Sequence, residues 1–90
     1  YNYSRMKLMK FGADWCNPCK IQNSEFEKNP PKVELQIVDV DEDTDDLASK
    51  YHVRNIPVIV LLDNDKEIHR WTGFTKTYQI NDYIDNLKKQ

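Results

Sequence analysis

The sequence lacks a long apolar run and has almost no excess of charge of either sign. A membrane-spanning helix needs about 20 consecutive apolar residues, whereas the most apolar run in this chain of 90 residues covers only positions 58–62. Thirteen Lys and Arg residues against fifteen Asp and Glu residues give a formal net charge of −2, so no basic field attracts nucleic acid or an anionic membrane. We therefore expect neither nucleic acid nor a membrane as a partner.

The chain is too short for more than one domain. Ninety residues with 39% hydrophobic and 11% aromatic side chains indicate one small folded unit over residues 1–90. A chain of this size buries only about 60–65% of its surface, which excludes a large enclosed cofactor cavity. We expect a monomer in the cytoplasm. The first residue is Tyr1 and no basic-then-apolar leader precedes the fold, so the alternative is a leader that has already been removed.

Cysteine is scarce, since Cys16 and Cys19 are the only two in the chain. A bridge between them closes a very small loop and stabilises the fold little, because this stabilisation grows with loop length. The pair is therefore either redox-active or half of a metal site. A zinc finger needs four ligands with two histidines about three to five residues apart, and His52 and His69 lack that spacing. We predict no metal site.

The first half of the chain predicts a strand, a helix and a second strand. Residues 6–12 are mostly apolar, which favours a buried strand. A helical pattern follows the cysteine pair and ends at the Asn-Pro-Pro run of residues 29–31, because proline cannot continue a helix. Residues 33–40 alternate between apolar and polar side chains at first, as a second strand does.

The second half predicts a short helix, a hairpin and a last helix. Asp43 or Thr44 is expected to cap the short helix. Residues 58–62 predict a central strand, which a turn joins to an antiparallel partner over residues 68–72. Residues 78–87 have the amphipathic pattern of a helix. The resulting order, β-α-β-α-β-β-α, predicts an α/β fold with a four-stranded mixed sheet flanked by three helices on both faces.

The cysteine pair has the spacing that dithiol chemistry requires. Cys16 is expected in the first turn of the first helix, where free N–H groups and the helix dipole favour a thiolate. Cys19 follows one turn later and is close enough to resolve a mixed disulfide. Pro18 suits a first helical turn, because the N–H that it lacks would be unpaired there, and it stiffens the segment between the sulfurs.

Three segments of the chain resemble the thioredoxin family. The run Trp-Cys-Asn-Pro-Cys-Lys at residues 15–20 looks like the active-site segment of that family. Residues 48–58 look like the stretch that ends in its cis-proline loop, and residues 38–41 look like the end of its second strand. Gly73 stands where the family has a glycine. The resemblance covers roughly residues 6–88 and implies a thioredoxin-like fold without the leading strand and helix of the family.

The resemblance also implies a role for each matching residue. Cys16 would be the exposed attacking thiol and Cys19 the buried resolving thiol. Substrate would bind at Ile56, at a cis Pro57 and at Gly73, with the Ile56 backbone pairing to an extended segment. The residues implied to flank the site are Trp15, Asn17, Pro18 and Lys20.

The chain departs from the family at positions that bear on the chemistry. Asn17 replaces the usual glycine between the cysteines. Lys10 stands where the family has a buried aspartate, and Gly12 stands where it has an aromatic residue. A cation near the sulfurs favours the thiolate and makes a disulfide more oxidising. We expect this effect if Lys10 points toward the sulfurs; the alternative is that its ammonium reaches solvent at the rim.

The function that these residues predict is thiol–disulfide exchange without a metal or organic cofactor. Cys16 and Cys19 would reduce disulfides in protein substrates, with electrons from a reductase like those that serve thioredoxins. A glutathione-dependent reductase of the glutaredoxin kind is one alternative, although Trp15 and the Asn17-Pro18 pair fit it poorly. An oxidising role outside the cytosol, favoured only by Lys10, is another. A module that keeps the fold for binding alone is the alternative from a different functional class.

Overall fold

The computed structural model describes residues 1–89 and contains one four-stranded mixed sheet in the order β2-β1-β3-β4. The central strand β1 (Met6–Gly12) runs parallel to β2 (Glu34–Asp39) and antiparallel to β3 (Val58–Asp63). The edge strand β4 (Lys66–Thr72) pairs antiparallel to β3. The predicted order of strands and helices along the chain and the mixed four-stranded sheet are confirmed. Within residues 1–5 the only regular element is a short 3-10 helix, Tyr3–Arg5.

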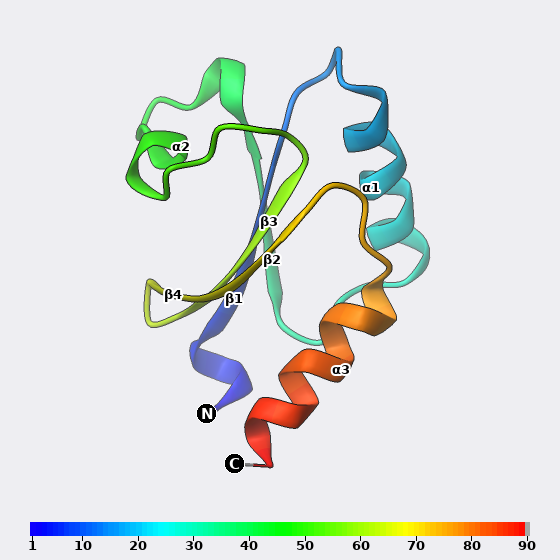
Figure 1. Cartoon of the computed structure of the whole chain (residues 1–90), viewed down its shortest axis with the longest axis vertical. Helices are drawn as coiled ribbons and strands as arrows, with labels where there is room; N and C mark the ends of the chain where they lie inside the picture. The colour runs from blue at the N-terminus through cyan, green and yellow to red at the C-terminus, as the bar shows by residue number, and fades with distance from the viewer. Residues whose placement is uncertain (90) are drawn as a thin grey trace.

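The helices cover both faces of the sheet (Figure 1). Helices α1 (Asn17–Lys28) and α3 (Thr77–Lys88) lie on one side, and the short α2 (Leu47–Lys50) lies on the other. No helix in residues 1–89 is both long enough and apolar enough to span a membrane. The expected three helices on two faces are thus confirmed.

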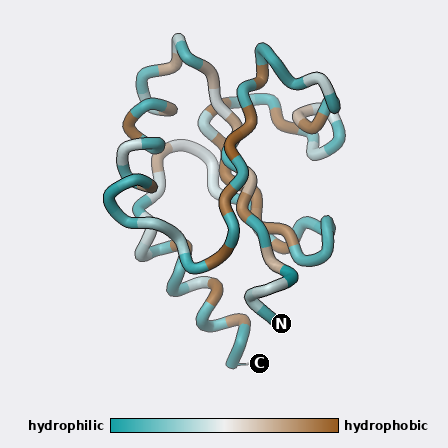
Figure 2. Tube along the Cα trace, turned by 180° about the vertical axis from the view of Figure 1, so that it is seen from behind, coloured by the Kyte–Doolittle hydropathy of each residue, from teal (hydrophilic) through white to brown (hydrophobic). Residues whose placement is uncertain are grey.

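Alternating side chains of β1 build a separate core on each face of the sheet. Met6 and Leu8 pack with residues of α1 and α3, whereas Met9 and Phe11 pack with the α2 side. Burying a side chain of this size stabilises a fold by about 1.5–3 kcal/mol. Figure 2 shows the hydrophobic trace concentrated along the strands between more polar helices. By the same alternation, Lys10 belongs to the face that α1 covers.

The start of α2 differs from the prediction. The residue before the helix is Asp46, with a left-handed backbone (φ 56°), and its side chain makes no capping bond. Asp43 caps the helix from further upstream, because its carboxylate accepts the N–H groups of Leu47 (2.9 Å) and Ala48 (2.7 Å). Asp43 therefore supplies the expected capping chemistry, and the expectation that Asp43 or Thr44 directly precedes the helix was wrong.

Both ends of the described chain lie at one end of the molecule, whose extents are 38 × 27 × 18 Å. The loop that leads from β1 into α1 lies at the opposite end (Figure 1). The Tyr3 hydroxyl donates to the Asp85 carboxylate over 2.5 Å, and this bond ties the first residues to α3. The cysteine pair is therefore remote from the termini.

Candidate redox-active site

The cysteine pair lies where β1 passes into α1. Cys16 is the N-cap of α1, and its Sγ atom accepts the N–H of Cys19 over 3.3 Å. The two cysteines form a disulfide with their Cα atoms 5.2 Å apart. Pro18 occupies the first turn of the helix, as predicted. The sulfurs are thus held at the positive end of a helix of twelve residues, where a thiolate is favoured.

The two sulfurs differ in burial, although less than the sequence suggests. Cys16 keeps 7% of its surface exposed and Cys19 keeps 1%. The expectation of an exposed attacking thiol was too strong, because Ala13, Val40 and Ile56 pack around the pair. Cys16 is still the more accessible of the two cysteines.

The predicted substrate-binding residues come together beside the disulfide. The Ile56–Pro57 bond is cis, as expected, and the Ile56 side chain packs against the cysteine cluster. Gly73 has a φ of 83°, which favours glycine, and its N–H donates to the Pro57 carbonyl over 2.8 Å. Residues 56–57 and 73 therefore form one backbone platform, although they are far apart in the sequence.

The flanking residues lie on the surface. Trp15 is 69% exposed, and its indole N–H donates to the Asp41 carboxylate over 2.9 Å. Asn17, Pro18 and Lys20 are exposed as well. The Asp41 contact holds the Trp15 ring at the edge of the site and leaves most of its surface free for contact with another molecule.

Lys10 lies beneath the cysteine pair and not at the rim. Its side chain is only 2% exposed, so the alternative in which its ammonium reaches solvent was wrong. A Cβ atom built on Gly12 would lie 2.6 Å from the Lys10 Nζ atom and 3.1 Å from the Cys19 Sγ atom. Both atoms therefore border the same bare stretch of backbone, and the absence of a side chain at Gly12 leaves room for the amine.

Burial and the neighbouring carboxylates have opposite effects on the pKa of Lys10. Burial lowers the pKa of Lys10, while the carboxylates of Asp39 and Asp14 raise it and offset part of this effect. A cavity of about 60 Å³ adjoins the amine and is bordered by both carboxylates and by Lys20. Among residues 1–89, no ion pair includes Lys10. Its amine therefore lies close to one sulfur and is not held by a carboxylate.

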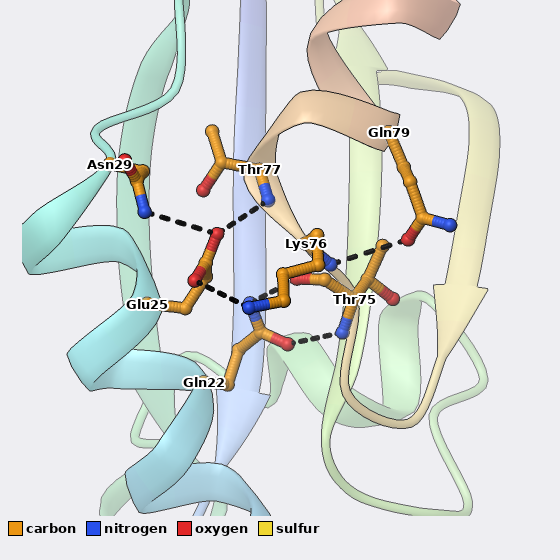
Figure 3. A network of polar contacts seen from close by, with 7 residues as sticks. All are labelled: Gln22, Glu25, Asn29, Thr75, Lys76, Thr77 and Gln79. Carbon is orange, nitrogen blue, oxygen red and sulfur yellow. Dashed lines mark hydrogen bonds and ion pairs between the residues drawn. The ribbon is translucent and has the colours of Figure 1, made fainter.

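The other half of α1 positions the Gly73 loop through a polar network (Figure 3). The Gln22 amide donates to the Thr75 carbonyl (2.9 Å) and accepts the Thr75 N–H (2.8 Å). The Glu25 carboxylate accepts the Thr77 N–H over 2.9 Å, and this bond is the main cause of the lowered pKa of Glu25. Two buried side chains of α1 thus fix the loop that carries part of the substrate platform.

Sequence reasoning missed several of these contacts. The bond between Trp15 and Asp41 depends on a three-dimensional approach that sequence spacing does not reveal. Gln22 falls within the helical pattern without any local signal. Gly12 was recognised as a departure from the family. A residue without a side chain two positions after Lys10 was the one sequence signal for an amine near Cys19.

The fold and the cysteine pair together define a thiol–disulfide exchange site. A family model described as Thioredoxin matches residues 2–86. The chain is 41% identical to a thioredoxin of Mycoplasma pneumoniae over 70 residues, which is 74% of this chain and 68% of that protein. It is 35% identical to a thioredoxin of Mycoplasma genitalium, with 88% of this chain and 79% of that protein covered.

Solved structures agree with these relatives. A mutant thioredoxin from Halobacterium salinarum superposes with a TM-score of 0.79 at 28% identity, over 92% of this chain and 74% of that one. The chain belongs to the thioredoxin family. It is a protein thiol–disulfide oxidoreductase, as the sequence predicted, and its redox-active group is the Cys16–Cys19 disulfide.

Proposed function

We propose that the chain reduces disulfides in protein substrates, with Cys16 as the attacking thiolate and Cys19 as the resolving thiol. The observation that carries the proposal is the placement of Cys16 as the N-cap of α1, the more accessible sulfur of the pair. Cys16 would attack a substrate disulfide, form a mixed disulfide and release one substrate thiolate. Cys19 would then attack the Cys16 sulfur and release the second.

Substrate would bind along the platform of residues 56–57 and 73. The cis Ile56–Pro57 loop and the Gly73 loop are joined by a backbone hydrogen bond, and an extended segment could add to the exposed backbone beside them. The exposed Trp15 ring borders the same site. The dithiol pair is the only redox group required, and we expect a reductase of the kind that serves thioredoxins to supply the electrons, in a monomer that acts in the cytoplasm.

Cys16→Ser tests the assignment directly. In insulin reduction with dithiothreitol, wild type should accelerate precipitation and Cys16→Ser should lower the rate to the uncatalysed level. Cys19→Ser should still attack once and should accumulate a mixed disulfide, visible by mass spectrometry under non-reducing conditions. Retention of wild-type turnover by Cys16→Ser would contradict the assignment of Cys16. A wild type no faster than the uncatalysed reaction would favour a binding module.

The two redox alternatives are separated by other measurements. A glutaredoxin-like enzyme would turn over a glutathione mixed disulfide at a rate that depends on glutathione, and we expect no such dependence. Because the Lys10 amine adjoins the Cys19 sulfur, we also expect a reduction potential above about −270 mV, the value known for thioredoxin. A midpoint at or below that value, titrated against glutathione, would refute the expected effect of Lys10.

A further inference from the structure

We propose that the outer edge of β2 is a docking site for an extended protein segment that carries Lys or Arg side chains. The segment adds a strand to the sheet and places one basic side chain beside the carboxylates of Glu42 and Asp45. Such binding uses a surface outside the substrate platform and is independent of the roles proposed for Cys16 and Cys19.

β2 is an edge strand whose outer side is unpaired among the described residues. It lies at one end of the sheet order β2-β1-β3-β4, and within residues 1–89 its backbone pairs only with β1. An edge strand presents a row of unpaired N–H and C=O groups, and an extended segment from another protein can pair with that row. The backbone of β2 therefore offers the hydrogen bonds for one more strand.

The two edges of the sheet differ in how they are protected against such pairing. β4 carries Lys66 and Arg70 and has a register shift against β3 at Leu61 and Leu62; basic side chains and bulges both hinder pairing at an edge. β2 pairs with β1 over six consecutive residues without a shift, and its four middle residues carry no charge and no proline. Its Ile37 side chain is 52% exposed. β2 is therefore the edge that accepts an added strand more readily.

An acidic hollow of about 280 Å³ lies alongside this edge. Four consecutive residues of β2 border it, together with Glu42, Asp43 and Asp45 from the segment that leads to α2. Successive side chains of a strand point to opposite faces, so a hollow that touches four in a row reaches the edge itself. Lys7 and Lys20, on neighbouring elements, lie outside the lining. Within residues 1–89, none of the three carboxylates belongs to an ion pair.

The charges along the edge distinguish a basic partner from a second copy of the chain. If β2 paired antiparallel with its own copy over its full length, Glu34 of each chain would lie opposite Asp39 of the other. Like charges that face each other destabilise a pair of strands, and Glu42 and Asp45 add to the repulsion. A partner with Lys or Arg side chains is attracted by the same carboxylates, and a lysine stem can pack on the exposed Ile37.

The acidic hollow lies at the same end of the molecule as the cysteine pair. A short 3-10 helix, Val40–Glu42, follows β2, and Asp41 of this helix accepts the indole N–H of Trp15. Figure 1 shows this segment and the loop before α1 at the same end of the sheet. A protein bound along β2 is therefore held close to Cys16, which raises its effective concentration there.

A fluorescein-labelled peptide of alternating Thr and Lys, long enough to span β2, is the probe. Its fluorescence anisotropy should rise on titration with the oxidised chain at low ionic strength. Hydrogen–deuterium exchange should slow at backbone amides of residues 34–39 in the complex, and exchange in β4 should not change. A peptide with Pro in place of every Thr keeps the charge but cannot pair as a strand, and it should bind at least about tenfold more weakly.

The double variant Glu42→Lys, Asp45→Lys tests the acidic hollow. It should weaken binding of the Thr-Lys peptide at least about fivefold. The matched control is Glu27→Lys, Asp82→Lys, which makes the same change in net charge at exposed positions of α1 and α3. The control should bind the peptide as wild type does, and both double variants should reduce insulin at the wild-type rate.

Four results would each overturn the proposal: no binding of the Thr-Lys peptide to wild type, equal affinities for the two peptides, equal affinities of the two double variants, or protection in β4 and not in β2. Protection of residues 34–39 that increases with the concentration of the chain alone would also overturn it, because the occupant would then be a second copy. Failure of wild type to reduce insulin would contradict the proposed function and not the docking site, since peptide binding has no redox step.

Discussion

Helix α1 borders two buried polar sites that are built in opposite ways. Toward its middle, the Gln22 amide is fully buried and pairs with both backbone polar groups of Thr75. Beneath its first turn, the Lys10 amine is almost as buried but forms no ion pair with any residue of the described chain. A satisfied buried group holds structure in place, whereas burying a charged amine without an ion-pair partner is costly. The comparison indicates that Gln22 stabilises the fold, whereas the buried Lys10 amine lowers its stability.

The largest change in stability that we expect comes from removing the two hydrogen bonds between Gln22 and Thr75. Gln22→Ala leaves the N–H and the carbonyl of Thr75 without their partners, which should cost about 3 kcal/mol of unfolding free energy. The melting temperature of the oxidised chain should therefore fall by about 15 °C.

The control for this variant is Asn23→Ala, which removes a neighbouring amide whose Oδ1 atom has no hydrogen-bond partner within residues 1–89. We expect a change of at most about 1 kcal/mol, measured by urea unfolding in parallel. Equal losses from the two variants would show that pairing with Thr75 is not what makes Gln22 stabilising.

A smaller effect of opposite sign is expected at Lys10. Lys10→Met replaces a buried cation by an apolar side chain of similar length and should stabilise the oxidised chain by about 1–2 kcal/mol at pH 7, which thermal unfolding measures. The pKa of Lys10 is lowered in the folded chain, so the unfolded chain binds more protons between the folded and unfolded pKa values. Wild-type stability should therefore rise with pH through that window, and the advantage of Lys10→Met should shrink.

Lys7→Met provides the comparison, since it removes the same charge from the same strand on the opposite face of the sheet. Its stability should stay within about 0.5 kcal/mol of wild type at every pH. If Lys10→Met proves less stable than wild type at pH 7, Lys10 has structural contacts that outweigh its burial. The contrast between a stabilising Gln22 and a destabilising Lys10 would then be wrong.

The smallest expected effect concerns Glu25 and appears only in acid. Its pKa lies below the ordinary value of 4.5, mainly because the carboxylate accepts the Thr77 N–H. The stabilisation that follows is complete above the unfolded pKa and is lost as the pH falls through the folded pKa. Glu25→Gln should therefore flatten the decline of the urea midpoint below about pH 5. An unchanged decline would place the acid sensitivity at another carboxylate.

The sequence predicted the elements well because their signals are local. Prolines at residues 30 and 31 end α1 near the expected position, and the apolar run at residues 58–62 lies within β3. The cysteine pair and the cis Pro57 were recognisable from a short motif and from the resemblance. The contact between the cysteine pair and the Ile56–Pro57 loop follows from the fold and not from either motif.

Contacts between distant segments were not predictable in the same way. Gln22 pairs with Thr75 across 53 positions, and Asp41 reaches Trp15 across 26. Each depends on side-chain direction and on how close two elements approach. The position of Lys10 was left open between two alternatives, because a lysine stem reaches either the core or the rim from the same strand position.

The placement of both chain ends has a practical consequence. Residues 1–5 and the end of α3 lie together, one molecular length away from the loop that carries Cys16. A surface or a fluorescent label attached at either end would therefore leave the sulfurs facing outward. An immobilised Cys19→Ser chain would present Cys16 to a mixture of proteins, and the disulfide partners that it captures could be eluted with a reductant.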